Sequence, residues 1–202
     1  MTATEATRPF ATRVTLADAL TGGAARSVLM NAVLVVAGAV LTGLAAQVSF
    51  QAPWTAVPYT LQTGSVLLVG TALGWRRGAL SMLLYVAAGA VGLPVYSSAS
   101  HGLDQLFGFK GGYLIGFIIA AAIVGWLAER GWDRSPLFTL GLMAVGTLVI
   151  YVVGVPVLAA SLGLPLSKAI DSGAIVFLPW DALKAVVAAG LLPLAWRLTK
   201  QG

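Results

Sequence analysis

The sequence predicts an all-α membrane protein with six transmembrane helices, and three observations lead to this fold class. Of the 202 residues, 58% are hydrophobic and only 9% are charged, whereas soluble domains are about 25% charged. The mean hydropathy is +0.91. Six apolar stretches alternate with short segments that carry most of the charge. A soluble enzyme of this length would need far more polar surface, so that class is excluded.

The predicted helices cover residues 27–50, 59–73, 79–91, 113–128, 137–162 and 179–198, within one transmembrane domain at 27–199. The first follows a polar N-terminal segment, 1–26, and its roughly 23 residues rise about 34 Å, enough to span a bilayer core. The second follows Pro53 and Pro58. It reaches only about 22 Å, so we expect it to begin inside the protein. The third lies between a basic turn at 74–78 and Gly92-Leu93-Pro94.

The last three helices are bounded by glycine, charge and proline. A Gly/Ser-rich segment, 95–112, precedes the fourth, and a charged turn separates the fourth from the fifth. Gly154 and Pro156 are expected to interrupt the fifth, which a loop at 163–178 follows. The sixth begins with Pro179, at a position where a missing N–H is harmless.

The distribution of basic residues predicts that both termini are cytoplasmic. Six helices place the two termini on one side, and that side carries nine of the 12 Lys and Arg residues. Short cytoplasmic segments are enriched in Lys and Arg in this way. The pI of 9.9 is therefore a topology signal. A nucleic-acid partner is not expected, because it would need one clustered basic patch.

Several kinds of chemistry are excluded by what the sequence lacks. It has no cysteine, so disulfides, zinc-thiolate sites and cysteine nucleophiles are ruled out. One histidine and seven carboxylates leave little for a metal centre, and neither a metal nor a cofactor is expected. There is no Walker loop, so the chain cannot hydrolyse ATP alone.

Asp181 and Lys184 stand out because they are charged residues in an otherwise apolar helix. They are three residues apart and therefore share one helix face. An ionised group in a membrane span costs about 2.5–3.5 kcal/mol. One interpretation is a polar ligand site; the other is an interfacial helix start, where Asp caps and Lys reaches water. A cation is unfavourable at the positive end of a helix dipole, so the presence of Lys184 there slightly favours the interpretation as a ligand site.

Two further segments place polar groups at helix starts. Tyr59, Thr60 and Gln62 lie at the mouth of the short second helix, where neutral hydrogen-bonding groups suit an amide or urea. The alternative is an ordinary capped helix start. In the run Gly111-Gly112-Tyr113, free backbone N–H groups favour anions or carbonyls. The four-residue spacing from Gly112 to Gly116 is also typical of helix packing.

These segments together resemble the BioY family, the biotin-binding substrate-capture (S) component of energy-coupling-factor (ECF) vitamin transporters. The matching segments, in order, are 57–63, 76–81, 89–95, 111–117, 154–156 and 178–184. The resemblance implies the six-helix S-component fold in a bacterial cell (inner) membrane, with high-affinity capture of biotin from outside. It also implies a transmembrane coupling protein and two ABC-type ATPases as partners.

The resemblance also implies site residues. Asp181 and Lys184 match the polar pair that opens the family's last helix and is associated with the biotin site, and Gln62 lies in a signature segment. Two departures are Ser98, in a segment that replaces a glycine-rich loop, and Lys110, where a Gly-Pro-Thr run is usual. The predicted site residues are Asp181, Lys184, Gln62, Tyr59, Gly112, Tyr113, Lys110 and Ser98.

The chemistry of biotin fits these groups. Its ureido ring has two N–H donors and one carbonyl, and its valerate tail is anionic. Asp181 is suited to accept from the ureido N–H groups, and Gln62 or Lys184 to donate to the carbonyl. The tail suits Lys110, Lys184 or the backbone N–H groups at Gly111-Gly112, and the sequence leaves open which of them binds it.

Three alternatives remain at this point. The chain is an S component for another vitamin, a small membrane-embedded enzyme that uses His101 and Asp104, or a structural subunit that binds no small molecule. We expect ligand capture without catalysis. Ala39 and Gly43 approximate a small-residue face on the first helix, through which many S components dock the coupling protein.

Overall fold

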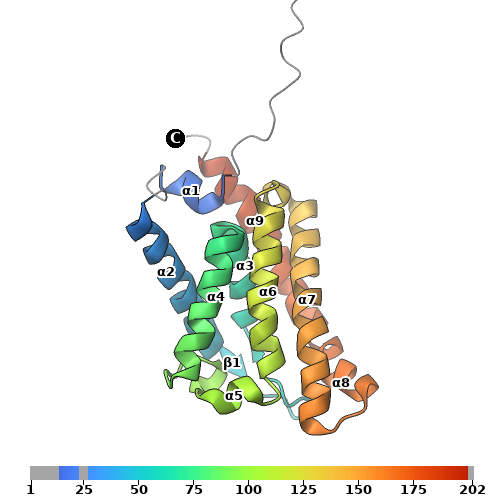
Figure 1. The fold of residues 1–202 in the computed structure, drawn as a ribbon. Helices are drawn as coiled ribbons and strands as arrows, with labels where there is room; N and C mark the ends of the chain where they lie inside the picture. Colours follow the sequence, from blue (N-terminus) through green and yellow to red (C-terminus); the bar gives the residue numbers. More distant parts are fainter. Residues whose placement is uncertain (1–13, 23–26, 200–202) are drawn as a thin grey trace, which may run out of the picture.

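The computed structural model describes residues 14–22 and 27–199 and shows long helices packed side by side in one bundle (Figure 1). The long helices in these residues are α2 (Val28–Gln47), α3 (Gln62–Leu73), α4 (Trp75–Ala90), α6 (Gly111–Ala128), α7 (Pro136–Leu162) and α9 (Leu178–Thr199). The helical fold class is confirmed. Four stretches are long and apolar enough to cross a membrane: Val28–Gln47, Gly111–Ala128, Pro136–Leu162 and Leu166–Thr199. The number of crossings and their direction stay predictions.

Short elements connect the long helices. They are α1 (Leu16–Leu20), α5 (Leu103–Phe107), α8 (Leu166–Gly173) and the single turns η2 (Ser97–Ala99), η3 (Trp132–Arg134) and η4 (Ile175–Phe177). A two-residue strand, β1 (Ser49–Phe50), pairs antiparallel with β2 (Tyr59–Thr60). In Figure 1, β1, α5 and α8 gather at one end of the bundle, and α1 lies at the other end near the last turns of α9.

The predicted basic turn at 74–78 is wrong. Gly74 alone separates α3 from α4, and Arg76 and Arg77 already belong to α4. Gly74 has φ 83°, a conformation that glycine adopts without steric cost. This lets the chain reverse at one residue, so α4 begins four residues earlier than expected.

The predicted interruption of α7 is also wrong, because this helix runs unbroken over 27 residues with Pro156 inside it. Proline is tolerated inside a membrane-spanning helix because neighbouring helices and side chains can satisfy the backbone groups that it frees. Gly154 is a packing position, since a Cβ there would lie 2.5 Å from the Tyr113 ring. Tyr59 lies in β2 rather than in a helix, because its backbone pairs with β1. The predicted loops at 95–112 and 163–178 contain α5 and α8.

The helices approach closely where glycines face a neighbouring backbone. A Cβ on Gly125 of α6 would lie 2.5 Å from the carbonyl carbon of Gly74, and one on Gly70 of α3 would lie 2.6 Å from the carbonyl oxygen of Ala121. Small residues commonly allow such approach in membrane bundles. On α2, Ala39 and Gly43 are buried inside the bundle, so the expectation that they form an outer docking face is wrong.

Two carboxylates connect elements by polar contacts at the end of the bundle where α1 lies. Asp18 of α1 pairs with Arg77 at 2.9 Å and accepts from Thr15. Burial opposes ionisation there, but the hydrogen bonds from Arg77 and Thr15 prevail and lower the pKa of Asp18. Asp133 is fully buried and accepts from Trp196 Nε1 at 2.6 Å. Burial raises the pKa of Asp133 despite that bond.

Candidate ligand-binding pocket

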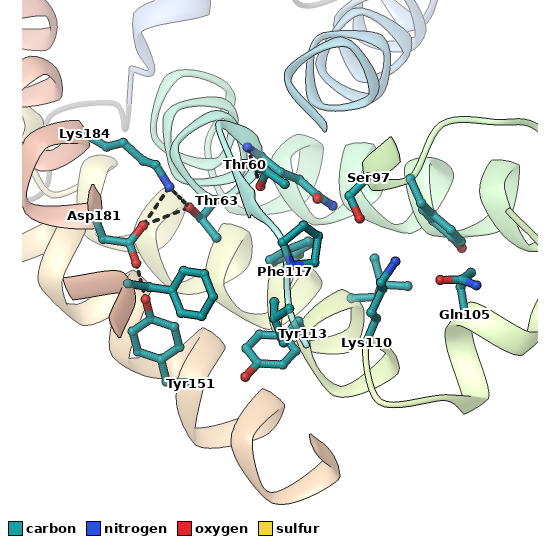
Figure 2. Close-up of a pocket in the computed structure, with 16 residues that line it drawn as sticks. Thr60, Thr63, Ser97, Gln105, Lys110, Tyr113, Phe117, Tyr151, Asp181 and Lys184 are labelled. Atoms are coloured by element: carbon teal, nitrogen blue, oxygen red, sulfur yellow. Dashed lines mark hydrogen bonds and ion pairs between the residues drawn. The ribbon is translucent and has the colours of Figure 1, made fainter. Parts of the chain in front are cut away.

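A pocket lies where α3, α6, α7 and α9 meet the segments that connect them (Figure 2). The open space among its lining atoms, including solvent at the mouth, is about 620 Å³. Its lining residues are Val57, Pro58, Thr60, Gln62, Thr63, Tyr96, Ser97, Gln105, Lys110, Tyr113, Leu114, Phe117, Tyr151, Phe177, Asp181 and Lys184. Apolar surface predominates, with a few polar groups aimed inward.

One side of the pocket carries an ion pair. Lys184 Nζ lies 2.8 Å from Asp181 Oδ1, and it also donates to Thr63 Oγ1 on α3. The Thr63 hydroxyl in turn donates to Asp181 Oδ1 at 3.1 Å. The hydrogen bonds of Asp181 therefore go to side chains of α3 and α9, which is not the arrangement of a simple helix cap.

Tyr151 of α7 is the member of this network that the sequence did not reveal. Its hydroxyl donates to Asp181 Oδ2 (Figure 2). Both carboxylate oxygens are thus engaged: Oδ1 accepts from Lys184 and Thr63, whereas Oδ2 accepts from Tyr151 alone and keeps a second lone pair free to accept from a ligand N–H. A tyrosine in an apolar helix gives no sequence signal by itself, because packing explains it equally well.

The middle of the pocket is aromatic. Tyr113 and Phe117 project from α6 (Figure 2), and Phe177 precedes α9. Tyr113 also donates its hydroxyl to the carbonyl of Gly173 at 2.8 Å, which fixes the ring against the end of α8. Flat, rigid walls of this kind suit a ring system with two faces.

Gln62 adds a neutral polar group to the pocket and is 6% exposed. Its Nε2 donates to the hydroxyl of Tyr85 at 2.8 Å. One N–H and the amide oxygen therefore remain for a ligand.

The opposite side of the pocket holds Lys110, with Gln105 and Ser97 nearby (Figure 2). Within the part of the chain that the structure describes, the Lys110 ammonium has no carboxylate at ion-pair distance. Burial lowers the pKa of Lys110. The two sides therefore differ in charge: one is internally neutralised, and the other presents a cation.

Five of the eight predicted site residues line this pocket: Asp181, Lys184, Gln62, Tyr113 and Lys110. Tyr59 lies behind it, with its ring stacked on Phe50 and its hydroxyl bonded to the carbonyl of Val176 at 2.9 Å. Gly112 packs against α7, since a Cβ there would lie 2.6 Å from that of Val157. Ser98 is exposed at the rim, and its neighbour Ser97 lines the pocket instead.

The residues of the enzyme alternative do not form a site. His101 and Asp104 are exposed and lie outside the pocket lining. Across residues 14–22 and 27–199, no group of three His, Cys, Asp or Glu side chains is placed to hold a metal ion.

Known proteins resemble this chain in sequence and in fold. The sequence model of the BioY family matches residues 13–201. The "Biotin transporter BioY" of Rhizobium etli is 39% identical over 140 residues, which cover 66% of this chain and 74% of that protein. The "Probable biotin transporter BioY" of Pyrococcus horikoshii is 40% identical over 148 residues, 73% of this chain and 85% of that one.

One solved structure shares the fold. It is the crystal structure of the S-component for biotin from an ECF-type ABC transporter, with a TM-score of 0.76 and 22% sequence identity. The match covers 86% of this chain and 93% of that one.

Proposed function

We propose, because the chain belongs to the BioY family, that it is the substrate-specific subunit of an ECF-type transporter and takes up biotin. The protein is a transport component and not an enzyme. It is a multi-pass membrane protein, in keeping with its long apolar helices. The relatives at 39–40% identity are named biotin transporters, and this supports biotin over another vitamin.

The difference in charge between the two sides of the pocket is the observation that supports biotin as the ligand. An ion pair, Asp181 with Lys184, lies on one side. On the other side lies the cation of Lys110, which has no carboxylate at ion-pair distance among residues 14–22 and 27–199. Biotin has a neutral ureido ring at one end and a carboxylate at the other. The match in polarity supports binding in one orientation, with the ureido ring at Asp181 and the valerate carboxylate at Lys110.

In this arrangement the polar ends of biotin have defined partners. A ureido N–H donates to Asp181 Oδ2, which has a free lone pair, and the ureido carbonyl accepts from Lys184 or Gln62. The apolar bicycle lies between Tyr113 and Phe117, whose rings bury its faces. Lys184 is already committed to Asp181, which leaves Lys110 for the anionic tail. Tyr59, Gly112 and Ser98 support the pocket from outside and make no contact with the ligand.

The finer features of transport complete the proposal. Biotin is captured at the outer face of a bacterial cell membrane, and both termini are cytoplasmic. Residues 27–199 form one membrane domain. A transmembrane coupling protein and two ABC-type ATPases supply the energy, in line with the absence of an ATP-binding motif from this chain.

Equilibrium dialysis of the detergent-purified protein against labelled biotin and other labelled vitamins tests the proposal. We expect tight, stoichiometric and reversible binding of unaltered biotin, with other vitamins bound far more weakly. Preference for another vitamin, chemical conversion of the ligand, or no binding at all would each overturn it in favour of one of the alternatives. His101→Ala serves as a control and should bind biotin as the unmodified protein does.

A further inference from the structure

The rim of the pocket contains a segment in an unfavourable backbone conformation. Ser98 and Ala99 are consecutive non-glycine residues with φ of 59° and 55°, a region that residues with a Cβ rarely adopt. The same segment supplies Tyr96 and Ser97 to the pocket wall. Contacts from outside the segment are therefore needed to hold this part of the wall in place.

Gln47, the last residue of α2, provides several of those contacts. One N–H of its Nε2 donates to the carbonyl of Gly43 in its own helix at 2.9 Å, and the other is shared between the carbonyls of Tyr96 at 3.2 Å and Val95 at 3.3 Å. Its Oε1 accepts from the backbone N–H of Ala99 at 3.0 Å. One side chain thus bonds both the start of the segment and its second left-handed residue.

The carbonyl of Val95 connects this clamp to the pocket. It accepts from Gln47 and also from the hydroxyl of Tyr85, at 3.1 Å. Tyr85 in turn accepts from Gln62 Nε2 at 2.8 Å, and Gln62 lines the pocket. A continuous path of hydrogen bonds therefore runs from a ligand-facing amide through Tyr85 and Val95 to α2.

We propose that Gln47 is a positioning residue, which holds the Val95–Ser100 segment in the conformation that completes the pocket and connects that segment to Gln62. The proposal rests on the proposed function in taking this pocket as the biotin site. Gln47 itself touches no ligand, since it lies outside the pocket lining. Its loss is expected to loosen the rim first and to weaken binding as a consequence.

Hydrogen exchange of the ligand-free protein tests the structural step without biotin. In Gln47→Ala, the amides of residues 95–100 should exchange faster, while the amides of α6 and the melting temperature stay unchanged. Val48→Ala is the matched control, because Val48 is the next residue and is 57% exposed. Unchanged exchange at 95–100 in Gln47→Ala would overturn the proposal whatever the ligand is.

Biotin dissociation rates test the consequence for binding. Loss of these hydrogen bonds should raise the dissociation rate about fivefold to thirtyfold in Gln47→Ala, with no change in Val48→Ala. The effect should shrink when Ser98 and Ala99 are both replaced by glycine, which adopts positive φ freely. An equal effect in both backgrounds would show that Gln47 does not act through the turn. Failure of the unmodified protein to bind biotin would instead count against the proposed function.

Discussion

Lys184 and Asp181 form an ion pair with an N–O distance of 2.8 Å, and their side chains are only 13% and 7% exposed. Removing one partner leaves the other charge buried and unpaired, which destabilises a protein strongly. We expect Asp181→Asn and Lys184→Met each to lower the melting temperature of the ligand-free protein. The double variant should regain most of that loss, because no buried charge remains.

Biotin binding should not recover with stability in the double variant. A charge-assisted hydrogen bond contributes about 1.5–3 kcal/mol, so Asp181→Asn should lower the affinity roughly tenfold to a hundredfold. Titration of the purified variants with labelled biotin measures the effect. A double variant that binds biotin as tightly as the unmodified protein would remove Asp181 and Lys184 from the site.

A second prediction concerns Lys110 and the ligand carboxylate. Lys110→Met keeps most of the apolar stem and removes the charge, so affinity for biotin should fall about tenfold or more. Affinity for biotin methyl ester, which has no charge on its tail, should stay nearly the same. Competition binding with both compounds measures the two affinities.

Lys168→Met is the matched control for that experiment, because Lys168 is exposed on α8 and lies outside the pocket lining. It should leave both affinities unchanged. An equal loss for biotin and its ester in Lys110→Met would show that Lys110 shapes the pocket without binding the carboxylate.

The dependence of binding on pH follows from the same side chain. Burial lowers the pKa of Lys110 below the ordinary value of 10.5. The ammonium is present below its pKa and lost above it, so affinity for biotin should fall as the pH rises through this lowered value. Biotin methyl ester should show no such fall, and neither should Lys110→Met with biotin. A decline confined to pH values above 10.5 would contradict this prediction.

The sequence predicted the charged side of the candidate pocket better than the remainder. Asp181, Lys184 and Gln62, which line the pocket, stood out because polar residues in apolar helices need a reason. Tyr151 and Phe177 were missed, since aromatic residues in such segments are explained equally well by packing. Gly112 was misplaced for the opposite reason: whether a glycine faces a ligand or a helix depends on the neighbouring chain, here α7.

The same distinction holds for the fold. The six long helices were predicted because hydropathy is a local property of the chain, and each expected apolar stretch corresponds to one helix. The Gly74 reversal and the unbroken α7 depend on tertiary contacts, for example between Gly154 and the Tyr113 ring. Local sequence patterns do not determine those contacts.

A fourth prediction tests the close approach of α6 to the α3–α4 reversal. A Cβ on Gly125 would lie 2.5 Å from backbone atoms of Gly74 and Trp75, which cannot move aside as a side chain can. Gly125→Ala should therefore lower the stability by about 1–3 kcal/mol or more. Gly190→Ala on α9 is the control, because nothing lies within 4 Å of a Cβ there. Thermal unfolding in detergent compares the two, and equal stability would contradict the packing.

The last prediction concerns the direction of the chain in the membrane. The chain has no cysteine, so each single-cysteine variant reports one position without background. Arg76 at the start of α4, Arg130 just after α6, His101 just before α5 and Asp171 on α8 are exposed. In Figure 1 the start of α4 and the end of α6 lie at the α1 end of the bundle, and α5 and α8 lie at the opposite end. Arg77 is less suitable as a probe, because it is bonded to Asp18. In intact cells, a membrane-impermeant maleimide should label His101→Cys and Asp171→Cys, and it should reach Arg76→Cys and Arg130→Cys only after the membrane is opened.

The excess of basic residues on the side of the termini requires this direction. The reverse pattern would place the termini outside and the pocket mouth in the cytoplasm, and capture of biotin from outside would then be excluded.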